Sequence, residues 1–312
     1  MKRMPLGNDG ELEVSAICQG TDHFGSRVDY DTSAAILDRY VAAGGNFLDT
    51  SNFYAAYIQG FKGGESEALI AKWMKERKNR NALVIGTKVG CPYQDVPMGA
   101  GAKIIEAEAE KSLKRLGIET IDMYYTHLDD RSVPFEEQLE AMDKLVKAGK
   151  VRCIGACNIK AWRLEEARCV SRHNGFVQHA CVEQRYTYLR PKPGANFGGQ
   201  VSTNSDLLDY CRHRGLQLIA YSPLLYGAYV REDRPLPPQY QHPDSEARMK
   251  ALRSVAEELD ATPNQVVIAW LMHRGVIPII GASRVEQIAE NLGCLEIELS
   301  DEMMAALNQA GA

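Results

Sequence analysis

The chain contains no long hydrophobic run. Its longest fully apolar stretch, residues 266–272, is far shorter than the roughly 20 residues that a membrane-spanning helix needs. Residues 1–5 also lack the apolar segment of a secretory signal peptide. Together these absences predict a cytoplasmic protein that has no membrane partner.

The chain also lacks an excess of positive charge. Its 36 Lys and Arg residues are outnumbered by 41 Asp and Glu residues, which gives a net charge of −5, and the basic residues are scattered. Surfaces that bind nucleic acid or anionic membranes need clustered basic side chains. The composition therefore excludes a nucleic-acid partner and favours a small molecule.

The sequence also lacks cysteines at the spacing of a metal site. The eight cysteines include no C-x-x-C pair, and the pair Cys153 and Cys157 would straddle a strand, which does not suit a tetrahedral zinc site. Several cysteines fall inside apolar runs, where a thiol packs as a small hydrophobe. We therefore predict reduced cysteines and no bound metal.

A Rossmann dinucleotide fingerprint is absent too. No G-x-G-x-x-G segment follows a predicted strand and opens a helix, because the glycine clusters at 60–64 and 194–199 both lie in predicted loops. A Rossmann dehydrogenase is therefore disfavoured.

From residue 17 onward, short predicted strands that end in Gly or polar residues alternate with stretches in which apolar residues recur with the period of a helix. The runs are residues 17–21, 46–49, 83–88, 121–127, 151–157, 180–184, 216–221 and 276–281. The helical stretches are residues 33–43, 65–78, 102–116, 135–147, 161–173, 204–214, 246–259 and 283–291. Eight such units predict an α/β fold, a (β/α)8 TIM barrel that forms one domain over residues 1–312.

Turn and cap residues mark the ends of these elements. Residues 4–6 and 12–14 are expected to form an N-terminal hairpin around the turn Asn8-Asp9-Gly10. Asp31-Thr32 and Ser300 are expected to cap the N-termini of helices, because their side chains can accept hydrogen bonds from free backbone amides.

Additional segments interrupt the regular alternation. Thr262-Pro263 is expected to open an extra helix that runs through residue 272. Segments 190–201 and 224–244 are too long for tight connections. Long loops at the C-terminal face of a barrel commonly bind ligands, so we expect both loops to lie near the functional site.

Four residues that could carry out a proton-coupled reduction lie at or just beyond the ends of successive predicted strands. Asp49 and Tyr54 follow the second strand, Lys88 ends the third and His127 ends the fourth. Strand ends meet at the C-terminal mouth of a barrel, where barrel enzymes keep their chemistry. Tyr54 is the candidate acid, and an ammonium group at Lys88 is expected to lower its pKa. Asp49 would balance Lys88, and a neutral His127 would orient the substrate.

Each of these residues also has an ordinary structural explanation. Asp49 could cap a helix, Tyr54 could be a loop aromatic, Lys88 could extend from a strand end and His127 could be a hydrogen-bonded polar residue. Their shared position at the ends of three consecutive strands favours the functional interpretation.

Other strand ends offer groups for a flat cofactor ring. Asn158 follows the fifth strand and Gln184 ends the sixth, and their amide groups can bond to the carboxamide of a cofactor. Tyr221 ends the seventh strand, and its ring can stack on a cofactor ring. After the eighth strand, Ser283 and Arg284 enter a helix whose N-terminus suits a nucleotide phosphate. For Asn158, Gln184 and Tyr221 the structural explanation is the stronger one, because Asn and Tyr are common at strand ends.

The sequence resembles the aldo-keto reductases over nearly its whole length. The motifs that carry the resemblance are Asp49-x4-Tyr54, Gly64-x-Ser66-Glu67, Lys88, His127, Gly155-x-x-Asn158, Tyr221-Ser222-Pro223-Leu224 and Gly281-x-Ser283-Arg284. The resemblance implies that Asp49, Tyr54, Lys88 and His127 form a catalytic tetrad.

The resemblance also implies NADPH binding, with NADH possible, at a site without a Rossmann fold. The implied cofactor contacts are Gly20, Thr21, Asp22, Asn158, Gln184, Tyr221, Ser222, Leu224, Gly227, Gly281, Ser283, Arg284, Gln287 and Asn291. We expect the substrate contacts to be His23, Phe24 and Tyr57.

The chain departs from the family pattern at a few positions. Cys157 replaces the Ser or Thr that many members carry before the asparagine, and Glu183 replaces the Asn before the glutamine. Asp22-His23 is more polar than the Met or Trp often found there, which suggests a hydroxyl-rich substrate such as a keto-sugar.

These patterns predict an NADP(H)-dependent oxidoreductase that reduces an aldehyde, ketone or keto-sugar to an alcohol, or catalyses the reverse reaction. Two alternatives remain open. A nucleotide-sensing binding subunit would keep the cofactor residues without turnover. A metal-dependent barrel hydrolase would also place Asp, His and Lys at strand ends, but it normally needs more histidines there.

Overall fold

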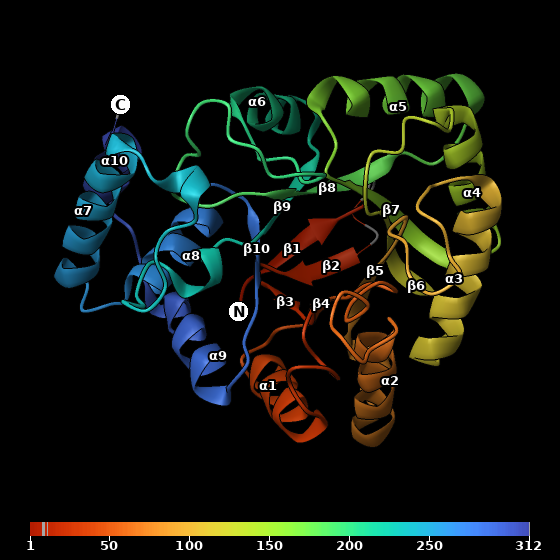
Figure 1. Ribbon diagram of the computed structural model, residues 1–312, viewed down its shortest axis with the longest axis horizontal. Coiled ribbons are helices and arrows are strands. Elements are labelled where there is room, and N and C mark those ends of the chain that lie inside the picture. Colours follow the sequence, from red (N-terminus) through yellow and green to blue (C-terminus); the bar gives the residue numbers. More distant parts are fainter. Residues whose placement is uncertain (8–9, 11, 312) are drawn as a thin grey trace.

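The protein is described by a computed structural model that covers residues 1–7, 10 and 12–311. Within these residues, eight parallel strands close into a barrel in the order β10-β3-β4-β5-β6-β7-β8-β9 (Figure 1). The strands are β3 (Cys18–Gly20), β4 (Phe47–Asp49), β5 (Val84–Val89), β6 (Ile121–Thr126), β7 (Val151–Cys157), β8 (His179–Arg185), β9 (Gln217–Tyr221) and β10 (Ile277–Ile280). The predicted (β/α)8 architecture is confirmed.

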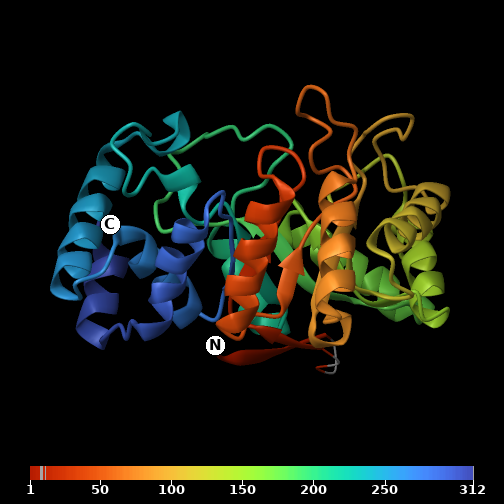
Figure 2. The ribbon, with the colours of Figure 1, turned by 90° about the horizontal axis from the view of Figure 1, so that it is seen from below.

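The N-terminal hairpin is present and closes one end of the barrel. Strand β1 (Arg3–Leu6) pairs antiparallel with β2 (Leu12–Ser15), and Figure 2 shows the pair at the end opposite the long loops. Leu6, Leu12 and Val14 are buried in one cluster with side chains of the barrel strands. In the expected turn, Asn8 and Asp9 lie outside the described residues.

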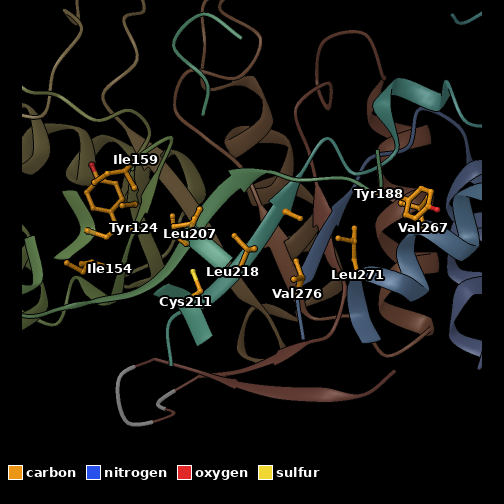
Figure 3. Packing of buried hydrophobic residues seen from close by; sticks show 14 of the residues in the cluster. Tyr124, Ile154, Ile159, Tyr188, Leu207, Cys211, Leu218, Val267, Leu271 and Val276 are labelled. Carbon is orange, nitrogen blue, oxygen red and sulfur yellow. The ribbon is translucent and has the colours of Figure 1, made fainter. Parts of the chain in front are cut away.

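Helices surround the barrel and bury its outer face. They are α1 (Tyr30–Ala42), α2 (Glu65–Arg77), α3 (Ala102–Leu116), α4 (Phe135–Lys147), α5 (Ala161–Asn174), α6 (Ser205–Arg214), α7 (Pro243–Glu258), α8 (Pro263–His273), α9 (Val285–Leu292) and α10 (Asp301–Gln309). Figure 3 shows this packing, with Leu207 of α6 near Leu218 of β9, and with Leu271 of α8 near Val276 in the same buried cluster. No helix in the part of the chain that the structure describes is long and apolar enough to cross a membrane.

Three helix starts differ from the sequence-based expectation by two or three residues. Helix α1 begins earlier than expected, because Asp29 and not Asp31-Thr32 accepts the capping hydrogen bond, from the Thr32 amide at 2.8 Å. Helix α7 begins at Pro243, whose fixed φ suits a first helical position. Helix α9 begins only at Val285. The expected cap at Ser300 and the expected extra helix after Thr262 are confirmed, and Thr262 caps that helix.

The two long segments lie at the C-terminal end of the barrel. Residues 190–201 form no helix or strand, and the connection from β9 to α7 contains the short helices η2 (Leu225–Gly227) and η3 (Pro238–Tyr240). Short helices η1 (Arg80–Ala82) and η4 (Gly293–Glu296) lie elsewhere. Figure 2 shows the long loops together at the top, opposite the hairpin. The loops thus border the mouth where the predicted functional residues end their strands.

Inside the barrel, the ring of Tyr125 occupies the space beneath the mouth. The residue is buried on β6, and Gly86 of β5 and Gly155 of β7 lie on either side of it. A Cβ atom at Gly155 would lie 2.5 Å from Cδ1 of Tyr125, and one at Gly86 would lie 2.9 Å from its Cε2. The two glycines therefore provide the space that the ring fills.

We expect Gly155→Ala to destabilise the protein by roughly 1–3 kcal/mol, because the new methyl group overpacks against Tyr125 in the closed barrel. Urea denaturation measures the free energy of unfolding. Gly199→Ala is the matched control, since a Cβ there would approach no described atom more closely than 3.8 Å. Equal stabilities for the two variants would show that the lumen has spare room around Tyr125.

Candidate active site

Barrel topology brings three of the four predicted tetrad residues into direct contact. Asp49 ends β4 and pairs in register with Gly86 of β5, so that Lys88 lies two residues farther along the adjacent strand. The loop after β4 folds back and places Tyr54 beside both residues. Asp49 and Lys88 are buried, and Tyr54 is half-buried. The phenol is thus the part of this group that reaches toward the mouth.

Lys88 is the centre of the hydrogen-bond network. Its Nζ donates to Asp49 Oδ1, to the Thr50 carbonyl at 3.1 Å and to the Tyr54 hydroxyl at 3.0 Å. The Tyr54 hydroxyl in turn donates to Asp49 Oδ2 at 2.9 Å. Lys88 Nζ also lies 3.5 Å from Glu183 Oε2. The ammonium group is therefore surrounded by acceptors.

The charges around Lys88 keep it protonated. Burial alone would lower the pKa of Lys88, but the negative charge of Asp49, together with that of Glu183 when it is ionised, outweighs burial and raises it. The pKa of Tyr54 is also raised, by burial and then by Asp49, Glu183 and Asp22. The expectation that Lys88 lowers the pKa of Tyr54 is therefore wrong for the protein alone. The adjacent carboxylates and the loss of water oppose the phenolate more strongly than the ammonium favours it.

His127 lies just beyond β6 and faces the same group. Its ring centroid is 6.2 Å from that of Tyr54, and its Nδ1 is 3.4 Å from Ser51 Oγ. Burial and the charge of Lys88 lower the pKa of His127 to about 3. The imidazole is therefore neutral at physiological pH, so it can donate one N–H hydrogen bond without carrying charge.

The two carboxamides predicted to hold a cofactor ring are bonded within the protein. Asn158 donates from Nδ2 to the His127 carbonyl at 3.0 Å, and its Oδ1 accepts from Tyr221 Oη at 2.7 Å and from the Val201 amide at 3.1 Å. Gln184 exchanges hydrogen bonds of 2.8 and 3.2 Å with the Ile159 backbone. Each amide nitrogen has a second hydrogen, although both residues are buried in the protein alone.

Backbone conformations with positive φ cluster in the loop after β9. Ser222, Leu225 and Tyr226 have φ values of 52°, 48° and 60°, and Gly227 has 90°. Such conformations are costly for residues other than Gly and concentrate at ligand-binding segments. Ser222, Leu224 and Gly227, which were predicted to contact the cofactor, all lie in this loop or at its edge.

A separate group of predicted cofactor residues lies at the start of α9. Ser283 donates from its amide and its hydroxyl to Gln287 Oε1, at 2.8 and 3.0 Å. Arg284 is exposed, and its side chain makes no hydrogen bond or ion pair with the described residues, although its carbonyl accepts from the Gln287 amide at 3.2 Å. Asn291 is buried one helix length away, and Gly281 is exposed just before the helix. The Arg284 side chain and the free amides at the start of α9 can therefore meet an anion, whereas the Ser283 hydroxyl must first exchange its bond to Gln287.

The residues after β3 divide between the mouth and the core. Thr21 is buried, and its hydroxyl donates to the Asp49 carbonyl at 2.8 Å. Tyr57, which is 48% exposed, bonds to Asp22, and His23 Nδ1 lies 3.8 Å from Asp22 Oδ2.

Phe24 lies in the core, whereas Gly20 ends β3 at the mouth, where it pairs in register with Asp49. Phe24 is 1% exposed in the core cluster beside α1 and α2, so the structure does not support it as a substrate contact. Gly20 ends β3 and packs against Ile279, which a Cβ atom would approach to 2.8 Å.

The sequence prediction did not include two residues that the structure places at this site. Glu183 lies beside Lys88, although it was noted only as a departure from the family pattern. Arg185, two residues farther along β8, bonds to Gln200 and lies 5.4 Å from the Tyr221 ring centroid. The two-residue period of Cys181, Glu183 and Arg185 on one strand could have indicated that all three share the lumen-facing side.

The closed parallel barrel and the buried lysine-carboxylate group beside a tyrosine at its mouth are typical of a barrel oxidoreductase. The comparison with known families agrees with this class. The sequence matches the aldo/keto reductase family over residues 16–312. The chain therefore belongs to the aldo/keto reductase family.

Individual relatives agree with this assignment. The chain is 30% identical to norsolorinic acid reductase stcV of Emericella nidulans, with 93% of this chain and 76% of that protein covered. It is also 30% identical to the uncharacterized oxidoreductase YrpG of Bacillus subtilis, with 97% and 94% covered. Aldo-keto reductase ausK of Aspergillus calidoustus is 29% identical, with 91% and 74% covered.

We expect the low pKa of His127 to make the protein less stable in acid. The unfolded chain takes up a proton near pH 6.5, whereas folded His127 does so only near 3. The contribution of neutral His127 to the free energy of unfolding is therefore fully present above pH 6.5 and is lost as the pH falls toward 3. The loss reaches about 1.4 kcal/mol per pH unit.

Chemical denaturation between pH 4.5 and pH 7 measures this loss, and His127→Asn should show a smaller one. His179, whose pKa burial lowers to about 4, contributes a similar slope in both proteins. The exposed His213→Asn is the control and should retain the full slope. Identical acid slopes for His127→Asn and the unmodified protein would contradict the prediction.

Proposed function

We propose that this chain is an NADP(H)-dependent oxidoreductase, acting as one domain, that reduces an aldehyde, ketone or keto-sugar to an alcohol or catalyses the reverse reaction. Tyr54 is the proposed general acid and base. The observation that supports this role most directly is the contact of its hydroxyl with both Lys88 and Asp49 at the barrel mouth. The family to which the chain belongs acts on carbonyl compounds.

Each residue has a distinct part in the proposed chemistry. The nicotinamide cofactor, when bound, supplies or accepts the hydride. Tyr54 donates its hydroxyl proton to the oxygen on which negative charge develops during reduction, and takes a proton from the alcohol in the reverse direction. Lys88 stabilises the resulting phenolate at 3.0 Å, and Asp49 holds Lys88 in place. His127, as a neutral donor, orients the carbonyl oxygen.

The residues present fit a dinucleotide at several points. The second amide hydrogens of Asn158 and Gln184 suit the nicotinamide carboxamide, and Tyr221 offers a ring for stacking. The positive-φ loop after β9 presents backbone groups to a pyrophosphate. Arg284 and Ser283 at the start of α9 suit the 2′-phosphate, which is why we propose NADPH over NADH.

The rim beside Tyr54 favours a polar substrate. Asp22, His23 and Tyr57 together offer a carboxylate, an imidazole and a phenol at the mouth. Hydroxyl groups on a substrate can pair with each of them. A keto-sugar therefore fits this rim better than a purely apolar ketone does.

Tyr54→Phe should reduce carbonyl reduction by about 100-fold or more, because it removes the proton donor and keeps the ring. Cofactor affinity should change little. The measurement is NADPH consumption in a screen of aldehydes, ketones and keto-sugars. Tyr30→Phe, which removes a hydroxyl on α1 outside the barrel mouth, is the control and should retain activity.

Two outcomes would argue against this prediction. Activity of Tyr54→Phe close to that of the unmodified enzyme would mean that another group is the acid. His127 would be the next residue to test. NADPH binding with no turnover of any compound in the screen would favour the nucleotide-sensing subunit.

Arg284→Ala should weaken NADPH binding by roughly 10- to 100-fold and leave NADH binding nearly unchanged, since a hydrogen bond to a charged group contributes about 1.5–3 kcal/mol. Fluorescence titration with each cofactor gives both affinities. Arg253→Ala changes an exposed arginine on α7 and serves as the control. An equal loss for both cofactors would remove Arg284 from the proposed 2′-phosphate site.

A further inference from the structure

Glu183 places a second buried carboxylate against Lys88. Glu183 is 4% exposed on β8, between Cys157 of β7 and Ile219 of β9 in the sheet register. Its Oε2 lies 3.5 Å from Lys88 Nζ, and this oxygen has no hydrogen-bond partner among the described residues. A buried carboxylate without such partners is costly if it is ionised.

The groups around Glu183 provide one cation and several acids. Asp49 of β4 and Lys88 of β5 are the nearest charges. The other titratable groups that sense its charge are Cys18 of β3, Tyr54 after β4, Tyr125 of β6, Cys157 of β7, Cys181 of β8 and Tyr221 of β9. Arg185, farther along β8, is held by Gln200. Lys88 is therefore the one cation in contact with Glu183 among the described residues.

Charge balance in the lumen permits only one of the two carboxylates to be ionised at low cost. Lys88 neutralises Asp49, with which it makes the closer contact. Ionising Glu183 as well would leave a net negative charge in the closed barrel. Burial and the charge of Asp49 accordingly raise the pKa of Glu183, to about 8. Below that pH Glu183 holds a proton.

We propose that Glu183 is a positioning residue that acts through Lys88: as a neutral carboxylic acid it completes the surroundings of the ammonium and leaves Asp49 as its sole counterion. This inference rests on the proposed role of Tyr54. When Glu183 loses its proton, the added negative charge holds the Tyr54 proton more tightly. Alcohol oxidation needs Tyr54 to accept a proton. Its rate therefore reaches the plateau only at a higher pH when Glu183 is ionised.

The protonation of Glu183 can be tested without cofactor or substrate. Because its folded pKa lies above the unfolded value of 4.5, its contribution to stability is present below 4.5 and is lost as the pH rises toward 8. From about pH 5 to 7.5, the unfolding equilibrium constant of the unmodified protein should rise about tenfold per pH unit relative to that of Glu183→Gln.

Glu108→Gln is the matched control for this measurement. Glu108 is also buried, but it bonds to Asn52, Tyr93 and Lys111, and despite its burial these bonds lower its pKa. Its contribution to stability is lost as the pH falls, which is the opposite sign. A Glu183→Gln variant with the same pH dependence of stability as the unmodified protein would overturn the proposal.

A pH profile of alcohol oxidation tests the link to Tyr54. The rate of alcohol oxidation by Glu183→Gln should reach its alkaline plateau about one pH unit earlier than that of the unmodified enzyme, because the negative charge cannot form. A residue with only a structural role would lower activity at every pH without moving the profile. An unmoved profile in a folded, active variant would overturn the inference and leave the proposed function intact.

Two further observations keep the outcomes separate. If the unmodified protein turns over no alcohol or carbonyl compound, the proposed function fails, whereas the stability comparison still decides whether Glu183 is neutral. If Glu183→Gln does not fold, an infrared difference spectrum of the unmodified protein between pH 6 and pH 9 replaces it. Loss of a protonated-carboxyl band across that range supports the proposal, and its absence overturns it.

Discussion

The burial of one ammonium group governs the arrangement at the mouth of this barrel. Lys88 is fully buried, and a buried charge is stable only when paired and hydrogen-bonded. Asp49, the Thr50 carbonyl and Tyr54 supply its partners, and each lies at or after the end of β4. The requirement to satisfy Lys88 therefore fixes the path of the chain after β4 and, with it, the position of the proposed acid.

The layer beneath Lys88 makes this arrangement possible. The Tyr125 ring lies 5.6 Å from the ammonium group and fills the lumen that Gly86 and Gly155 leave open. A closed lumen excludes water from below, so the charges on Lys88 and Asp49 interact through protein and not through solvent. The same exclusion raises the pKa of Tyr54 and lowers that of His127.

The sequence predicts most of the fold because hydrophobic period and strand-helix alternation are local signals. The bounds of β7, α3 and α4 agree with the predicted ranges to the residue. Helix α1 begins early because its cap, Asp29, lies outside the apolar pattern. Phe24 was misassigned because its position after β3 says nothing about which way the loop turns. Burial is the main cause of the raised pKa of Tyr54. The hydrophobic pattern of a strand does not show how deeply the residues after it are buried.

The proposed tetrad and the proposed cofactor residues differ in how firmly the fold holds them. Lys88, Asp49 and Tyr54 contact one another directly and depend on the strands. Asn158 instead connects His127, Tyr221 and the Val201 amide of the long loop. A ligand that binds Asn158 must therefore be compatible with the hydrogen bond between Asn158 and the loop that contains Val201. The proposed chemistry thus depends on the strand ends, whereas the proposed recognition of ligands is coupled to the longer connections.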